Sequence, residues 1–228
     1  MTTKSLDDNW ENIWSNKDIS QISKHKIILK KLMIATGHVG KNKNIDISSW
    51  KTYSKKILKI LSPKKKFNLF EVGCGAGALL YLLKKNYSDY SGCDYSKNLI
   101  QIALKYFDRN KIFYKNAKNL DVKKKFDHVI ASSVFEYLSH DVSKKVLNNM
   151  TKKSKKKILI SEILNHDYRN KFLKQFKKKK NSKINYSFYK KSYFLNFAKK
   201  KKLKITFFPS LIPYSKQKKY RYTVLLSK

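Results

Sequence analysis

Residues 67–80 read FNLFEVGCGAGALL, and this stretch decides the fold. Its first half is an apolar run of strand length. Its second half opens with Gly73, Gly75 and Gly77 and continues into Ala and Leu residues typical of a helix. Glycine lets the chain turn sharply and lets a ligand approach the backbone, so the stretch indicates an adenosine-cofactor site. Gly73, Gly75 and Ala78 also fit the spacing of a nicotinamide-dinucleotide site, so spacing alone does not choose the cofactor.

Strand-like and helix-like runs alternate after this stretch. The expected strands are 67–72, 90–93, 112–114, 126–131 and 158–163, and the expected helices are 78–85, 99–107 and 142–150. A further helix near 190–200 and strands at 205–208 and 220–226 complete the chain, the last two as a hairpin at one sheet edge. The alternation predicts a doubly wound, mostly parallel α/β sheet.

The first 62 residues have a different, helical pattern. Trp10 and Trp14 share one helix face, a second apolar stretch runs from 22 to 34, and a third helix is expected over 47–61, before Pro63. These two tryptophans and Trp50 are expected either to pack on the sheet or to close over the cofactor or line the acceptor pocket. We therefore predict an N-terminal helical cap at 1–62 and a cofactor-binding domain at 63–228, which together form one structural unit.

Acidic residues near the glycines narrow the choice of ligand. Glu71 precedes Gly73 by two positions, where a carboxylate orients the loop or meets a cationic group of the ligand. Asp94 ends the second expected strand and is suited to accept hydrogen bonds from ribose hydroxyls; otherwise it is a turn carboxylate. Ser96 is expected to cap the next helix.

The net charge of +38 comes almost entirely from lysine, since 50 of the 53 basic residues are lysine. Proteins that read nucleic-acid sequence rely on arginine, so a drift in base composition explains the excess at least as well as a polyanion site. In both cases the protein attracts anionic partners.

Several other classes are not expected. No apolar run approaches the ~20 residues that span a bilayer, and the N-terminus lacks the order of a secretory signal, which predicts a cytoplasmic protein. Cys74 and Cys93 have neither metal-knuckle nor redox-pair spacing, so no metal is expected.

Four strings in this order resemble the class I S-adenosylmethionine-dependent methyltransferase family: FEVGCGAGALL (70–80), SGCDYSKNLIQIA (91–103), KNAKNL (115–120) and FDHVIASSVFEYL (126–138). The resemblance covers about 67–165. The flanks ATGHVGKNKNIDISSW and FYKKSYFLNFAKK look like a bacterial subgroup that methylates small molecules or sugars. The family resemblance implies the strand order 3-2-1-4-5-7-6, with strand 7 antiparallel.

The resemblance also implies roles for individual residues. Glu71 and the glycine loop would hold the amino-acid end of the cofactor, and Asp94 its ribose. The family commonly has an acidic residue after the third strand, where this chain has Asn116 and Ala117. The full implied cofactor set is Glu71, Gly73, Cys74, Gly75, Gly77, Asp94, Tyr95, Ser96, Asn116, Ala117, Ser132 and Ser133.

An oxygen or nitrogen acceptor needs a group that removes its proton. The candidates are His140, Glu136 and His166, with Asp167 as a further one and Tyr137 as an orienting group. Each has a structural alternative, such as capping a helix or lying in a solvated loop. His128 falls within an expected strand and is expected to be a core residue.

We therefore expect a methyltransferase that acts on a small metabolite or a sugar-bearing, anionic acceptor. The first rival is a nucleic-acid methyltransferase, which a basic surface continuous with the cofactor site would support. The second is a methyltransferase-like subunit without catalytic activity. The intact glycine loop and Asp94 argue against the second rival, because neither is needed merely to fold.

Overall fold

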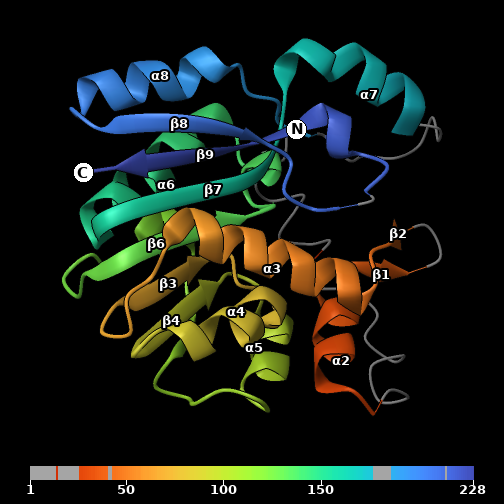
Figure 1. The fold of residues 1–228 in the computed structure, drawn as a ribbon, viewed down its shortest axis with the longest axis vertical. Coiled ribbons are helices and arrows are strands. Elements are labelled where there is room, and N and C mark those ends of the chain that lie inside the picture. Colours follow the sequence, from red (N-terminus) through yellow and green to blue (C-terminus); the bar gives the residue numbers. More distant parts are fainter. Residues whose placement is uncertain (1–13, 15–25, 41–42, 177–185, 214) are drawn as a thin grey trace, which may run out of the picture.

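The computed structural model describes residues 14, 26–40, 43–176, 186–213 and 215–228. Its body is a seven-stranded sheet in the order β5-β4-β3-β6-β7-β9-β8 (Figure 1). The strands are β3 (Asn68–Val72), β4 (Asp89–Asp94), β5 (Ile112–Tyr114), β6 (Phe126–Ser132), β7 (Ser154–Leu164), β8 (Lys204–Pro209) and β9 (Arg221–Ser227). Only β9 runs against its neighbours β7 and β8. The expected order 3-2-1-4-5-7-6 is confirmed.

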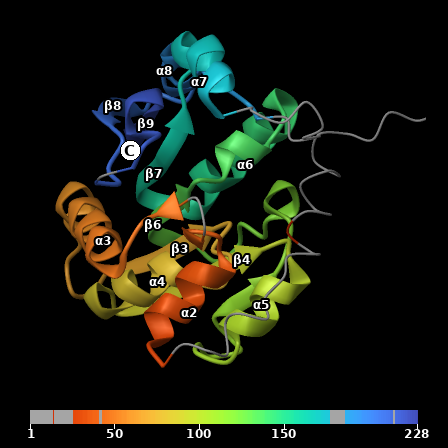
Figure 2. The same cartoon turned by 90° about the vertical axis from the view of Figure 1, so that its right-hand side faces the viewer.

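Helices cover both faces of the sheet. They are α2 (Ile28–Ala35), α3 (Ile47–Leu61), α4 (Ala78–Leu83), α5 (Lys97–Ala103), α6 (His140–Lys153), α7 (Arg169–Phe176) and α8 (Lys191–Lys200). Figure 2 shows α2, α3, α4 and α5 on one side of the sheet and α6 on the other. No helix in the described part of the chain is both long and apolar enough to cross a membrane.

Alternate strand residues supply the two cores. Leu69, Ile130 and Leu159 pack with the first group of helices, whereas Phe70, Val129 and Ile158 pack with α6 and α8. Successive side chains of a strand point to opposite faces, so a sheet covered on both faces needs apolar residues at consecutive positions. The strands are therefore unbroken apolar runs in the sequence because both faces of the sheet are buried.

Helix α3 shows how local chemistry sets the bounds of an element. The Asp46 side chain accepts a hydrogen bond from the Ser49 amide at 2.6 Å, and Ser62 ends the helix in a left-handed conformation. The buried residues Trp50, Tyr53 and Ile57 recur at helical spacing. The helix predicted at 47–61 is confirmed.

Three features were not predicted. A two-stranded antiparallel sheet, β1 (Val39–Gly40) with β2 (Lys43–Asn44), follows α2. Strand β7 begins at Ser154 rather than near 158, because the exposed Lys155 and Lys156 interrupt the apolar pattern but not the backbone pairing. Helix α7 buries only Phe172, so it left almost no periodic signal. Trp10 lies outside the described residues.

Candidate cofactor-binding and active site

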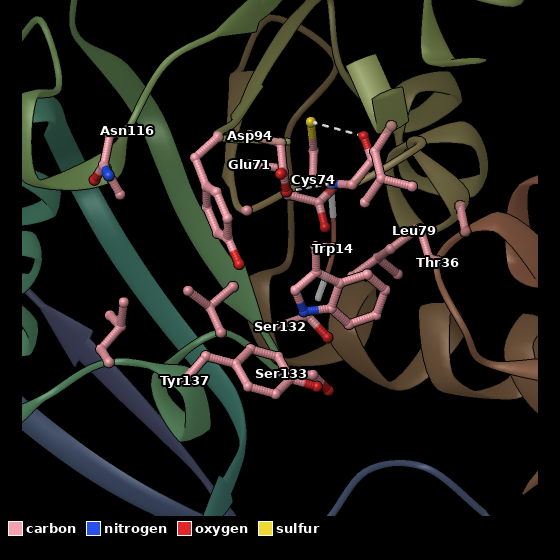
Figure 3. Close-up of a pocket in the computed structure, with 18 of the residues that line it drawn as sticks. Trp14, Thr36, Glu71, Cys74, Leu79, Asp94, Asn116, Ser132, Ser133 and Tyr137 are labelled. Atoms are coloured by element: carbon pink, nitrogen blue, oxygen red, sulfur yellow. Dashed lines mark hydrogen bonds between the residues drawn. The ribbon is translucent and has the colours of Figure 1, made fainter. Parts of the chain in front are cut away.

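A cavity lies at the carboxyl ends of β3, β4 and β6, where ligands bind in open α/β sheets. Figure 3 shows Glu71 and Asp94 at one end of the cavity and Tyr137, Ser132 and Ser133 at the other. Ten of the twelve predicted cofactor residues line it: Glu71, Gly73, Cys74, Gly75, Asp94, Tyr95, Asn116, Ala117, Ser132 and Ser133. These ten are among the 23 residues that line the cavity, so the sequence predicted a little under half of its wall as cofactor-binding residues.

The glycine loop fits closely under its neighbours. Gly73 and Gly75 have φ of +67° and +55°, a region that L side chains rarely adopt. A Cβ on Gly73 would lie 2.4 Å from Cγ2 of Val134, and one on Gly75 would lie 2.7 Å from Cγ2 of Thr36. Glycine at these positions allows the positive φ of the turn and the close approach of Val134 and Thr36 to the loop.

Gly77 and Ser96 do not line the cavity but support its wall. A Cβ on Gly77 would lie 2.4 Å from Cε2 of Phe107, so this glycine allows the close packing where α4 begins. Ser96 Oγ accepts from the Leu99 amide at 3.4 Å, which confirms the predicted cap of α5. The Ser96 hydroxyl also donates to the Trp14 carbonyl at 3.2 Å.

The Asp94 carboxylate connects β4 to the glycine loop. Its Oδ2 accepts from the Gly75 amide and its Oδ1 from the Ser96 amide, both at 2.8 Å. Burial raises the pKa of Asp94, although these amides act in the opposite direction. Each oxygen can accept a further hydrogen bond, so the carboxylate is able to hold both the loop and a ribose.

Glu71 is the less satisfied of the two acids. It is 2% exposed and lines the cavity, and among the described residues its Oε2 has no hydrogen-bond partner. Burial, and then the neighbouring Asp94, raise the pKa of Glu71 well above its ordinary value. A cationic ligand group at this position would relieve the cost of the buried charge.

The far end of the cavity is held by hydrogen bonds between hydroxyls. The Tyr53 hydroxyl lies 2.7 Å from Ser132 Oγ and 2.6 Å from Ser161 Oγ, and so ties α3 to the ends of β6 and β7. Ser133 follows with φ of +54°, an uncommon conformation for a residue other than glycine. Asn116 Oδ1 accepts from the Lys118 amide at 3.0 Å and closes the turn after β5.

These residues fit S-adenosylmethionine. The buried, unpartnered oxygen of Glu71 suits the amino group of the methionine part. Gly73 and Gly75 line the cavity and pack against Val134 and Thr36 without a Cβ, so the backbone of the loop can face a ligand. Asp94 is buried yet retains acceptor capacity for ribose hydroxyls.

The predicted catalytic residues are placed away from this cavity. Glu136 is buried and forms an ion pair with Arg221, with 2.6 Å between Oε2 and Nη2. His140 stacks on Tyr189 with ring centroids 4.9 Å apart, and His166 is exposed. Neither these three nor Asp167 lines the cavity, so their catalytic roles stay predictions without geometric support. Tyr137 does line it.

The sequence reasoning missed Thr36 and His38, whereas it offered Trp14 and Trp50 either as core packing or as residues that face the cofactor or the acceptor. Thr36 and His38 follow α2, and Trp50 lies on α3. Trp50 Nε1 donates to the Ala78 carbonyl at 3.1 Å, and the His38 ring packs against the Trp50 ring at a tilt of 33°, with centroids 4.2 Å apart. Trp14 lines the cavity and meets Tyr137 edge-on at 6.0 Å. Apolar spacing did not reveal which cap residues face the cofactor.

His128 is buried, as expected, with Nδ1 at 2.9 Å from the Tyr87 hydroxyl.

Comparison with known proteins places this site in a family. Residues 70–156 match the family model described as "Methyltransferase domain". This segment contains the glycine loop, Asp94 and the turn after β6. Comparison with curated protein sequences gives no match.

Solved structures with the same fold cover nearly the whole chain. One is magnesium protoporphyrin IX methyltransferase from Synechocystis PCC 6803 with bound SAH, at 11% identity and TM-score 0.70, covering 98% of this chain and 100% of that one. Another is the plantazolicin methyltransferase BpumL in complex with a triazolic desmethylPZN analog and SAH, at 18% identity and TM-score 0.60, covering 98% and 96%. The methyltransferase domain of bacterial CtHen1-CN matches at 17% identity and TM-score 0.58, covering 79% and 98%.

The domain match, the sheet order and the cavity agree with one another. Residues 70–156 match a methyltransferase domain, the whole chain has the fold of S-adenosylmethionine-dependent methyltransferases of known structure, and S-adenosylmethionine is the methyl donor.

Proposed function

We propose that the methyl acceptor is a small metabolite or a sugar-bearing, anionic intermediate, methylated on oxygen or nitrogen. The observation that carries this proposal is the pair of aromatic rings that borders the far end of the cavity. Trp14 and Tyr137 meet edge-on there, and Figure 3 shows both beside Ser132 and Ser133. A wall of packed aromatic rings suits a small or slender acceptor, because a bulky one would have to displace these rings.

The donor is bound, in this proposal, by the residues that the family resemblance assigned. Glu71, Gly73 and Gly75 hold the amino-acid end, and Asp94 holds the ribose. Tyr95, Asn116 and Ala117 surround the adenine, and Ser132 and Ser133 flank the methyl-bearing side. S-adenosylmethionine supplies a methyl group already activated on sulfur, so the protein mainly aligns the two reactants in line and excludes water.

Proton removal from the acceptor is assigned to His38. Among the described residues it is the histidine that lines the cavity, and its ring packs against that of Trp50. Once an acceptor is known, His38→Asn should lower turnover by roughly 10²- to 10⁴-fold while S-adenosylmethionine still raises Tm. Unchanged turnover would remove His38 from this role.

A cytoplasmic location is also part of the proposal. Cys74 and Cys93 are both buried and unpaired, as suits a reducing compartment.

The experiment that tests the acceptor class follows S-adenosylhomocysteine release. The full-length protein is given S-adenosylmethionine with sugar nucleotides, hydroxylated or amino-bearing small metabolites, or RNA of mixed sequence. Release with one of the small-molecule pools and none with RNA supports the proposal. Release with RNA alone overturns it. Thermal unfolding with S-adenosylmethionine, S-adenosylhomocysteine and NAD checks the donor separately, with a shift expected for the two adenosyl compounds only.

A further inference from the structure

The amino ends of the strands, at the sheet edge opposite the cofactor cavity, carry a row of lysines. In parallel α/β sheets the loops at this edge lead from helices into strands, and here each of them contains lysine. The exposed members are Lys64, Lys65, Lys66, Lys85, Lys123, Lys124, Lys125, Lys152, Lys155, Lys156, Lys200, Lys201, Lys202, Lys204 and Lys228. We call this set the lysine edge.

The sheet order arranges these residues into a continuous row. Lys85 precedes β4, Lys64–Lys66 precede β3, and Lys123–Lys125 precede β6. Lys155 lies at the start of β7, and the antiparallel β9 returns its carboxyl end, with Lys228, to the same edge, since Ser227 pairs with both Lys157 and Lys204. Neighbouring strands lie about 4.8 Å apart, so seven strands span roughly 29 Å.

The acidic residues at this edge, Asp89, Asp108, Asp121 and Asp127, are outnumbered by its lysines. Asp89 is already shared, with Oδ1 bound by Lys111 at 2.5 Å and Oδ2 by Lys124 at 3.1 Å. Two lysines near this edge donate to backbone carbonyls instead of to acids. Lys153 donates to the carbonyls of Asp121 and Lys124, and Lys157 donates to those of Ile60 and Leu61. Burial and then a neighbouring lysine lower the pKa of Lys84 and Lys228. Like charges here are close enough to repel, and a bound polyanion would relieve that repulsion.

Aromatic rings support several of these ammonium groups. The Lys156 Nζ lies 5.1 Å from the Phe67 ring centroid, and the Lys124 Nζ lies 5.2 Å from that of Phe126. Lys153 sits between the rings of Phe70 and Phe126, at 4.5 and 5.2 Å. Side chains held in this way lose less conformational entropy when they bind a ligand.

We propose that the lysine edge binds the phosphate backbone of nucleic acid, without preference for sequence or for RNA over DNA. Lysines act as point charges that neutralise phosphates, whereas base reading relies on arginine, and only one of the three arginines, Arg109 in the loop before β5, lies at this sheet edge. The described segments at this edge are loops and the three-residue 3₁₀ helix Lys84–Asn86, which are too short to enter a groove as a recognition helix does. The large exposed hydrophobics of the described residues, such as Ile28, Tyr114 and Leu195, lie outside the lysine edge, which argues against insertion into a membrane.

This site goes beyond methyl transfer. The described lysines that line the cavity are Lys115 and Lys118, on the turn after β5 and at the other end of the strands. A nucleic acid on the lysine edge is therefore a tether or scaffold for the enzyme rather than the methylated group.

The test compares two quadruple variants of the full-length protein that lose equal charge. The edge variant carries Lys65→Gln, Lys125→Gln, Lys155→Gln and Lys200→Gln. The matched control carries Lys51→Gln, Lys55→Gln, Lys144→Gln and Lys174→Gln, all exposed and outside the row. Binding of fluorescein-labelled single strands of about 20 nucleotides, longer than the row, is followed by anisotropy over a salt series.

The edge variant should bind about tenfold or more weakly near 0.15 M salt, and its log–log salt slope should fall by about 3, since each single-strand contact contributes about 0.7. The control should keep the wild-type slope, RNA and DNA of one sequence should bind alike, and S-adenosylmethionine should shift Tm equally in all three proteins. Equal loss in both variants would overturn the proposal in favour of diffuse charge. No binding at low salt, or edge-dependent binding to phosphatidylserine vesicles that exceeds binding to the oligonucleotides, would overturn it as well.

Discussion

The Oδ2 atom of Asp94 accepts a hydrogen bond from the amide of Gly75 at 2.8 Å, which ties the end of β4 to the glycine loop at the end of β3. The two residues are far apart in the chain, but the parallel pairing of β3 with β4 brings both strand ends to the same edge. The acid therefore shapes the loop before any ligand arrives. Cofactor affinity and loop geometry should respond together to changes at either residue.

Asp94→Ala should weaken S-adenosylmethionine binding by roughly 10- to 150-fold, corresponding to ~1.5–3 kcal/mol for hydrogen bonds to a charged group. Titration calorimetry measures the change. Asp89→Ala is the matched control, because Asp89 begins the same strand and pairs with lysines at the opposite edge. Equal affinity in the wild type and Asp94→Ala would contradict the assignment of Asp94.

Gly75→Val should abolish cofactor binding, because the new side chain would start 2.7 Å from Thr36 at a φ unsuited to it. Gly77→Ala serves as comparison. Its Cβ would strike Phe107 rather than the cavity wall, so this variant should lose Tm yet keep a shift with ligand. The readout is the ligand-induced change in Tm. A full shift in Gly75→Val would mean that the loop does not cradle the cofactor.

Glu71→Gln should raise the Tm of the ligand-free protein at neutral pH and reduce the shift that S-adenosylmethionine produces. The folded pKa of Glu71 lies above its unfolded value, so ionisation disfavours the folded state as the pH rises above 4.5, and an amide escapes this cost. Glu162→Gln should instead lower Tm, since both Glu162 oxygens already accept hydrogen bonds, from Ser210 and Leu211. A Glu71→Gln protein that is less stable without ligand would argue against this account.

Burial lowers the pKa of His128 to about 4, from an ordinary 6.5. Between these values the unfolded chain binds a proton that the folded protein does not. The contribution of His128 to the free energy of unfolding is therefore fully present above pH 6.5 and falls by about 3 kcal/mol as the pH falls toward 4. Urea unfolding of the wild type and His128→Asn across this range isolates the effect, and the exposed His166→Asn is the control. Parallel curves for all three proteins would show that His128 contributes nothing.

Glu136→Gln should act on stability rather than on chemistry. Breaking the buried Glu136–Arg221 pair leaves an uncompensated guanidinium and costs about 3–5 kcal/mol. Urea unfolding measures this loss, and the shift of Tm with S-adenosylmethionine should remain. If the variant were as stable as the wild type but inactive on the acceptor, the predicted catalytic role of Glu136 would return.

The strand order shows how much local sequence determined. Apolar runs of strand length at 67–72 and 126–131, with helical patterns between them, specify a parallel sheet, since both faces of such strands must be buried. The glycine triplet and Asp94 could also be predicted, because both are local features of the sequence. The glycines mark a loop that needs positive φ, and Asp94 is a carboxylate at the end of the next strand.

What the sequence left undecided depends on distant partners. The sequence made Glu136 a candidate for removing the proton of the acceptor, yet Arg221, 85 residues later, holds it in an ion pair. His38 and Trp50 have no motif of their own, and only the packing of α2 and α3 over the strand ends brings them to the cavity. The lysines, scattered along the chain, form a row only because the sheet places the start of each strand at one edge. Local periodicity and backbone conformation are encoded by neighbouring residues and could be predicted. Side-chain partners and surface continuity arise from contacts between segments far apart in the chain, and only the tertiary structure decided them.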